Sequence, residues 1–302
     1  MKVDEKRFQA VLRERCLTKY AICSLAGISS RTIAKIAKRE DLREAVVCRI
    51  ATALGVGVAE IAAQNEILLR LKQEESVKLS GGLYHETQVR LTYNSNHIEG
   101  SRLTEDQTRY IFETKTIGAL SSDLPVDDIL ETTNHFRCID SVIQHAEEPL
   151  SESYILSLHA LLKAGTHSAE RYGAGVYKKL PNTVGGIATV APADVKGEIN
   201  ALLARYNKIR APRFEDLVEF HHSFECIHPF QDGNGRVGRL IIFKECLRNG
   251  YIPTYVDDRY KPEYYNGLRN WKEERGFLLE TFRFGQDLYK HLLDYFSVPY
   301  QD

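Results

Sequence analysis

The chain has 302 residues, of which 43% are hydrophobic and 27% charged, so it can bury a core and is not wholly disordered. Its formal net charge of −1 gives no whole-chain argument for binding nucleic acid or an anionic membrane. No apolar run reaches the roughly 20 residues of a membrane span, and the N-terminus is too charged for a signal peptide. The six cysteines form no CxxC pair. We therefore expect a cytoplasmic protein with reduced cysteines and no membrane partner.

The first 64 residues predict a separate domain of four or five short helices. They carry 12 Lys and Arg against 7 Asp and Glu, whereas the rest of the chain is net acidic. Residues 18–39 resemble the helix-turn-helix of repressor-type DNA-binding domains, with Gly27 at the turn. The expected recognition helix, about 30–39, carries four basic side chains: Arg31, Lys35, Lys38 and Arg39. DNA is thus a candidate partner through residues 18–39, and the alternative is a helical bundle with a solvated basic face.

After this domain we expect a charged helical connector over 65–82 and a mostly α-helical domain over 83–300. Helical periodicity is clear in several segments: 151–164, 194–210, 214–227, 234–249, 261–272 and 277–296. The one β region spans 172–193, where Val176-Tyr177 and 187–190 are strand-like. The pattern predicts a hairpin of about 176–190 in an otherwise helical fold.

The densest group of polar residues is HPFQDGNGRVGR, residues 228–239. Its glycines allow backbone N–H groups to converge at a helix N-terminus, which favours anions. Arg236 and Arg239 are three residues apart and so share a helical face. Asp232 offers an oxygen ligand for Mg²⁺, and His228 a base that titrates near neutrality. Together these features predict a polyphosphate site with a proton to remove.

Two other interpretations of this region are open. The spacing of its glycines fits a dinucleotide fingerprint, but that motif requires a preceding hydrophobic strand, which is absent from the pattern here. Four residues offer ligands for zinc, two of them at i,i+4 spacing on a helix: His221, His222, Cys226 and His228.

The motif is similar to the Fic signature HxFx(D/E)GNGRxxR and matches it at every position. The resemblance extends over about residues 84–290 and implies transfer of AMP from ATP to a hydroxyl of a target protein. It implies that His228 is the general base, that Asp232 holds Mg²⁺, and that Phe230 anchors the loop. The remaining motif residues would then contact the ATP phosphates: Gly233, Asn234, Gly235, Arg236, Val237, Gly238 and Arg239.

Upstream, Ser95-Asn-His-Ile-Glu99-Gly100 places Ser95 and Glu99 on one helical face, with Gly100 as a C-terminal stop. It resembles the inhibitory motif that one class of the family carries N-terminal to its core, here about residues 84–100. A carboxylate paired to Arg239 would occupy the arginine that the γ-phosphate of ATP needs. The resemblance also allows Glu99 to support the reverse reaction, removal of AMP.

The resemblance further implies that the hairpin docks the target protein by strand addition. Four hairpin residues would lie near the nucleotide: Val184, Gly185, Gly186 and Ile187. Tyr264 and Tyr265 would line the adenine and ribose, although core packing is the alternative for such a pair. Where some relatives carry an asparagine seven residues later, this chain has Lys272.

The sequence therefore predicts an autoinhibited protein adenylyltransferase that uses ATP and Mg²⁺. Self-modification and a homo-oligomer are further expectations. The alternatives are a DNA-binding regulator that uses the Fic core as an ATP sensor or self-modifier, and an enzyme that mainly removes AMP.

Overall fold

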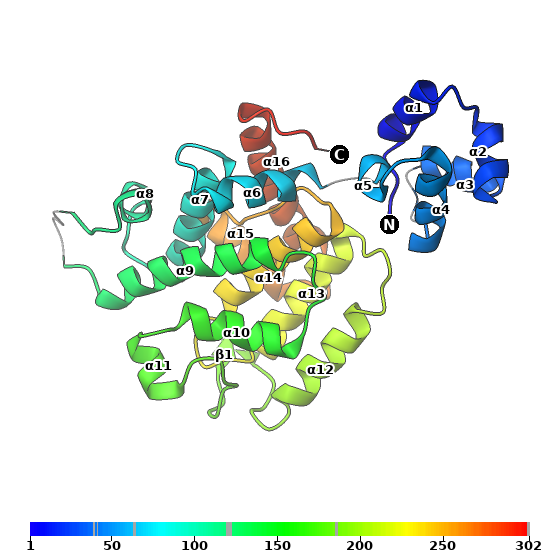
Figure 1. The fold of residues 1–302 in the computed structure, drawn as a ribbon. Coiled ribbons are helices and arrows are strands. Elements are labelled where there is room, and N and C mark those ends of the chain that lie inside the picture. The colour runs from blue at the N-terminus through cyan, green and yellow to red at the C-terminus, as the bar shows by residue number, and fades with distance from the viewer. Residues whose placement is uncertain (39, 41, 63–64, 119–122, 185–186, 301–302) are drawn as a thin grey trace. The chain divides into compact units, whose positions relative to one another are not determined.

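The computed structural model describes the whole chain except residues 39, 41, 63–64, 119–122, 185–186 and 301–302 (Figure 1). It divides into two compact units, Met1–Asn65 and Glu66–Asp302, and each has its own buried apolar core. In the described part of the chain, no helix is both long and apolar enough to cross a membrane.

The described residues of the smaller unit form five short helices: α1 (Glu5–Glu14), α2 (Lys19–Ala26), α3 (Ser30–Ala37), α4 (Glu44–Leu54) and α5 (Val58–Ile61). Gly27 ends α2 with a φ of +59°, a left-handed conformation that glycine adopts at little cost, and α3 begins three residues later. The apolar faces of both helices are buried, while three basic side chains of the expected recognition helix are exposed: Arg31, Lys35 and Lys38. Arg39 lies outside the described residues.

The larger unit is mostly helical. Its helices are α6 (Glu66–Ser76), α7 (Leu83–Ile98), α8 (Glu105–Thr114), α9 (Val126–Gln144), α10 (Glu152–Leu162), α11 (His167–Tyr172), α12 (Val195–Tyr206), α13 (Phe214–Ile227), α14 (Asn234–Asn249), the 3₁₀ helix η1 (Asp258–Tyr260), α15 (Lys261–Arg269) and α16 (Gly276–Tyr295). Central to the unit is α14, which is buried along most of its length and packs against α7, α9, α10 and α13 (Figure 1). Side chains at the start of α14 can therefore meet residues from several helices.

The expected helical connector contributes to the core of the larger unit. Its residues 66–76 form α6, which buries Ile67, Leu68 and Leu71 there. The strands are shorter than expected, with β1 at Thr183–Val184 and β2 at Ile187–Ala188, paired antiparallel. Val176-Tyr177 forms no strand, because the chain there runs beside the motif loop, where the Lys178 N–H donates to the Pro229 carbonyl at 2.9 Å.

Candidate active site

The motif loop joins the end of α13 to the start of α14 and is held in shape by its own side chains. The Asn234 amide accepts from the Phe230 N–H at 2.7 Å and donates to the Phe230 carbonyl at 2.8 Å. The Phe230 ring is fully buried and stacks on the His159 imidazole, with 3.8 Å between ring centroids. Gly233, at a φ of +85°, turns the chain into α14. Asn234 thus stabilises the loop, because both the oxygen and the nitrogen of its side chain are hydrogen-bonded to the backbone of Phe230.

His228 ends α13 in the left-handed region, at a φ of +52°, and its side chain is 19% exposed. Burial and, next, the ammonium of Lys178 lower the pKa of His228 to about 4. The imidazole is therefore neutral at pH 7 and can accept a proton. Its Nδ1 lies 4.0 Å from Oε2 of Glu225, a carboxyl whose pKa burial raises to about 8.

Asp232 and Arg236 meet two further charged side chains that the sequence analysis did not identify. Oδ2 of Asp232 accepts from Nζ of Lys163 at 2.5 Å, and its Oδ1 accepts from Nη2 of Arg236 at 3.2 Å. Glu131, on α9, accepts from both Lys163 and Arg236. Burial alone would raise the pKa of Asp232, but Arg236 and Lys163 lower it to about 2, so the carboxylate is ionised.

Arg239 is 2% exposed and reaches the end of α7. Its Nη2 donates to Oε1 of Glu99 at 2.7 Å and to the Ser95 carbonyl at 2.9 Å, and its Nε donates to Oγ of Ser95 at 3.0 Å. Burial alone would raise the pKa of Glu99, but Arg239 and then Arg236 hold it below its ordinary value. The predicted pair of Glu99 and Arg239 is thus present in the structure, and Gly100 follows it with a φ of +97°.

The glycine that precedes Arg236 lies against this pair. A Cβ on Gly235 would stand 2.3 Å from Oε1 of Glu99 and 2.9 Å from Nη1 of Arg239. A Cβ on Gly238 would likewise stand 2.4 Å from Oε1 of Glu225. A Cβ at Gly235 or Gly238 would therefore collide with a carboxylate. The space that these carboxylates need, and not an unusual backbone conformation, favours glycine at both positions.

The paired tyrosines separate into two environments. Tyr264 is 1% exposed, and its hydroxyl lies 2.8 Å from Nε2 of His221, so it belongs to the core. Tyr265 is half-buried. The expected role of the two tyrosines in lining a nucleotide stays a prediction, and the side chain of Lys272 is exposed.

Of the suggested zinc ligands, His222 and Cys226 contact each other, with Nε2 of His222 3.4 Å from Sγ of Cys226. His221 contacts Tyr264, and His222 stacks on Trp271 with 5.2 Å between ring centroids. Among the residues that the structure describes, no group of three or more His, Cys, Asp or Glu is arranged to hold a metal ion. The single carboxylate of Asp232, with its side chain 43% exposed, instead fits Mg²⁺, which commonly takes one or two carboxylates together with substrate phosphates.

The hairpin is fastened to the motif loop by a buried lysine. Nζ of Lys178 donates to Oδ1 of Asn182 at 2.7 Å, to Oγ1 of Thr189 at 2.6 Å and to the Ile227 carbonyl at 3.3 Å. Nδ2 of Asn182 donates to the Phe230 carbonyl at 3.1 Å. Of the four hairpin residues expected near the nucleotide, the backbones of Val184 and Ile187 pair with each other, while Gly185 and Gly186 lie outside the described residues.

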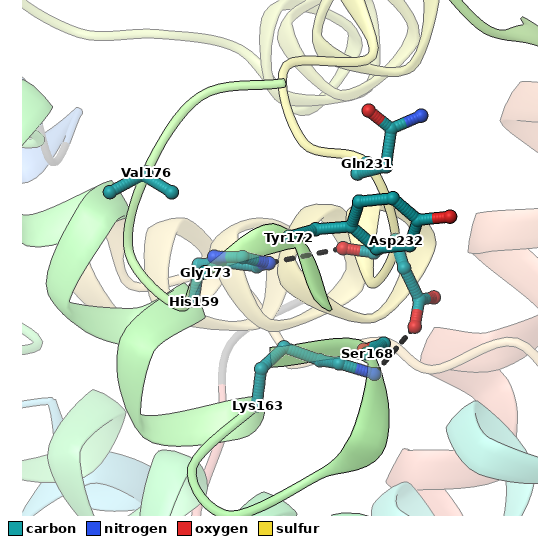
Figure 2. A pocket seen from close by; sticks show the side chains of 8 residues that line it. All are labelled: His159, Lys163, Ser168, Tyr172, Gly173, Val176, Gln231 and Asp232. Atoms are coloured by element: carbon teal, nitrogen blue, oxygen red, sulfur yellow. Dashed lines mark hydrogen bonds and ion pairs between the residues drawn. The ribbon is translucent and has the colours of Figure 1, made fainter. Parts of the chain in front are cut away.

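A small polar pocket opens on one side of Asp232. Figure 2 shows its lining residues: His159, Lys163, Ser168, Tyr172, Gly173, Val176, Gln231 and Asp232. His159 fixes two of the surrounding segments, because its Nδ1 accepts from the Gly175 N–H at 2.9 Å and its Nε2 lies 3.0 Å from the Asp232 carbonyl. A histidine and a lysine within the apolar helix predicted at 151–164 were the only signal of these contacts in the sequence.

Comparison with known proteins agrees with the motif. Residues 149–245 match the Fic/DOC family. The chain is 30% identical over 180 residues to a protein adenylyltransferase Fic from Nematostella vectensis, which covers 58% of this chain and 41% of the relative. It is 26% identical over 212 residues to the protein of the same name from Aedes aegypti, covering 69% of this chain and 42% of the relative. The chain thus spans about two fifths of the length of these curated relatives.

Solved structures share the fold. A Fic-domain-containing signalling protein from Bacteroides thetaiotaomicron matches with a TM-score of 0.61 and 23% identity, over 76% of this chain and 94% of that one. Fic-1 from C. elegans, as an E274G variant, matches with a TM-score of 0.56 and 18% identity, over 97% of this chain and 99% of that one. The HPFQDGNGRVGR loop lies inside the matched segment 149–245. The chain is therefore similar to the Fic/DOC family over the segment that contains the motif.

Proposed function

We propose that this chain transfers AMP from ATP to a hydroxyl group of a protein. The proposal rests on the motif loop, which begins with a neutral His228 and also carries an ionised Asp232. Two arginines, Arg236 and Arg239, follow at the start of α14. His228 takes the proton of the acceptor hydroxyl, the hydroxyl oxygen bonds to the α-phosphorus, and the bond to the β-phosphate breaks to release pyrophosphate. The names of the curated relatives support this reaction.

The chain's own residues would position the nucleotide. Arg236 and the backbone N–H groups at the start of α14 are suited to the phosphates, because a helix N-terminus and buried cations both favour anions. Mg²⁺, bound at Asp232 together with the phosphates, would neutralise the charge of the leaving pyrophosphate.

The test is transfer of label from α-³²P-ATP to protein, with His228→Ala as the inactive variant. Loss of a general base costs about 10²- to 10⁴-fold in rate, while nucleotide binding should persist. His167→Ala is the matched control, since His167 lies on the same unit with its side chain 79% exposed. Transfer at an undiminished rate by His228→Ala would exclude the mechanism.

We further propose that Glu99 holds the enzyme in an inactive state. The pair of Glu99 and Arg239 supports this, because one guanidinium cannot serve both that carboxylate and a γ-phosphate. In the same state Glu99 could activate water for removal of AMP, which is the second candidate reaction for this site. Release of AMP from a modified protein by wild type, and its loss in Glu99→Gln, would favour that second reaction.

The hairpin is the proposed docking site for the target protein. Two short antiparallel strands at the edge of the site can accept an extended segment by strand addition, and the exposed Leu180 offers an apolar contact beside them. A hydroxyl on the chain itself would serve the same chemistry, so self-modification is part of the proposal.

The small unit is a proposed DNA-binding domain. The exposed Arg31 and Lys35 on α3 and Lys38 at its C-terminal cap support this, since basic side chains on such a helix contact phosphates and guanine edges. Neutralising Arg31 and Lys35 together should weaken duplex binding, measured by fluorescence anisotropy at two salt concentrations, without changing AMP transfer. An equal loss of both functions would contradict the assignment and indicate a role in folding.

A further inference from the structure

Four charged side chains form a closed ring around the start of the motif helix. Glu131 contacts Lys163, Lys163 contacts Asp232, Asp232 contacts Arg236, and Arg236 returns to Glu131. Two of these residues belong to the Fic motif, and two, Glu131 on α9 and Lys163 after α10, lie outside it. The ring alternates in sign and carries no net charge.

Lys163 is the unusual member of the ring. It is 2% exposed, although its Nζ points toward the small pocket beside Asp232 (Figure 2). A buried ammonium requires anionic partners, and Lys163 has two of them, Glu131 and Asp232. One of these is the carboxylate that would hold Mg²⁺.

We propose that Lys163 is an internal counter-ion that competes with the divalent cation for Asp232 and thereby sets the affinity of the site for it. The inference rests on the assignment of Asp232 as the metal ligand in the proposed function. With the ammonium 2.5 Å from Oδ2, the carboxylate is already paired with a cation before any metal ion binds.

The ring also explains how the cation can gain access. When a divalent ion binds Asp232, the ammonium of Lys163 keeps its contact with Glu131, so it is not left buried without a partner. Arg236 keeps Glu131 as well when it turns toward a phosphate. Glu131 thus remains the anionic partner of Lys163 and Arg236 while Asp232 exchanges Lys163 for the divalent cation.

The net charge of the ring predicts opposite changes in cation affinity for substitutions of Lys163 and of Glu131. Lys163→Met leaves the ring at −1 and should bind a divalent cation about 10-fold more tightly, because a unit charge a few ångströms from the ion is removed from a half-buried site. Glu131→Gln leaves the ring at +1 and should weaken binding by a similar factor. The double variant restores neutrality and should return close to wild type.

The experiment measures binding of Mn²⁺ alone to the full chain, from the loss of the free-ion signal in electron paramagnetic resonance. Asp232→Asn defines the part of the binding that belongs to this site. Lys163→Arg keeps the charge and should behave like wild type. Lys179→Met, at an exposed lysine outside the ring, is the matched control for Mn²⁺ binding.

Opposite shifts in Lys163→Met and Glu131→Gln, with recovery in the double variant, are the expected result. A misfolded site would weaken binding in both single variants and would not recover in the double one, so that pattern overturns the inference. An unchanged affinity for Mn²⁺ in Lys163→Met also overturns the inference. In that case, loss of AMP transfer in Asp232→Asn would still support the proposed function, so the two failures can be told apart. If Asp232→Asn leaves Mn²⁺ binding unchanged, the metal assignment fails and this inference fails with it.

Discussion

Removing the Glu99 carboxylate should release AMP transfer. Glu99→Gly breaks the contact with Arg239 and leaves the guanidinium free to bind the γ-phosphate. Glu99 caps the end of α7 at a φ of −85°, a conformation open to glycine, and its side chain is 28% exposed, so the change should not disturb the core.

The magnitude follows from the kind of contact that is lost. A charge-assisted hydrogen bond to a buried arginine contributes about 1.5–3 kcal/mol, which corresponds to roughly 10- to 150-fold in the population of the productive pose. Ser95→Ala should have a weaker effect, because the Ser95 carbonyl still accepts from Nη2 of Arg239 after the hydroxyl is gone. Glu99→Asp should relieve inhibition partly, because a shorter side chain reaches Arg239 poorly.

The assay is incorporation of α-³²P-AMP into the chain itself and into lysate proteins, at matched ATP and Mg²⁺. Glu99→Gln is the matched control for size, and it keeps a hydrogen-bond acceptor while losing the charge, so its rate should lie between wild type and Glu99→Gly. A wild-type rate equal to that of Glu99→Gly would refute the competition for Arg239 and leave the enzyme assignment intact.

Two further predictions concern the arginines and pH. In the Glu99→Gly background, Arg236→Ala and Arg239→Ala should each lose labelling, and full activity of the Arg239 variant would show that the contest for the γ-phosphate is misassigned. Burial holds the pKa values of four histidines at about 3 or 4: His135, His159, His221 and His228. Because these values are below the unfolded value near 6.5, each histidine should lower the stability as the pH falls from 7.5 to 5.5. Glu225, with its pKa raised to about 8, acts in the opposite sense, but the histidines outnumber it, so urea unfolding should show a net loss of stability. An unchanged or higher stability at pH 5.5 would contradict these protonation states.

The sequence predicted the parts of the site that lie close together in the chain or follow a helical spacing. The helices at 214–227 and 234–249 match α13 and α14, because a turn-forming loop separates two apolar periodic segments. The pairing of Glu99 with Arg239 came from the family resemblance, and the geometry agrees with it. The prediction of a strand at 176–177 was wrong, since the chain there runs beside the motif loop and the next residue, Lys178, donates its N–H to the Pro229 carbonyl.

The sequence did not predict the residues that support the motif from outside. Lys163 and Glu131 lie 69 and 101 positions before Asp232, and only the packing of α9 and α10 on α14 brings them to it. Lys178 bonds to two oxygens of its own hairpin, from Asn182 and Thr189, and to the Ile227 carbonyl at the end of α13, and no sequence pattern indicated these contacts. The contact of Tyr264 with His221 could not be predicted either, because the sequence of a helix does not indicate whether a tyrosine hydroxyl contacts a histidine or a nucleotide.

The two motif arginines have carboxylate partners of different accessibility, which explains why inhibition would act through only one of them. Arg236 pairs with Glu131, which lies within α9, has a side chain 14% exposed and also holds Lys163. Releasing Glu131 would leave two buried cations short of a partner, which is costly. Arg239 pairs with Glu99, which stands at the end of α7, is 28% exposed and holds no second cation in the described structure. A carboxylate at a helix end can leave its arginine at lower cost, so the contact that a γ-phosphate must displace is the one best suited to a reversible switch.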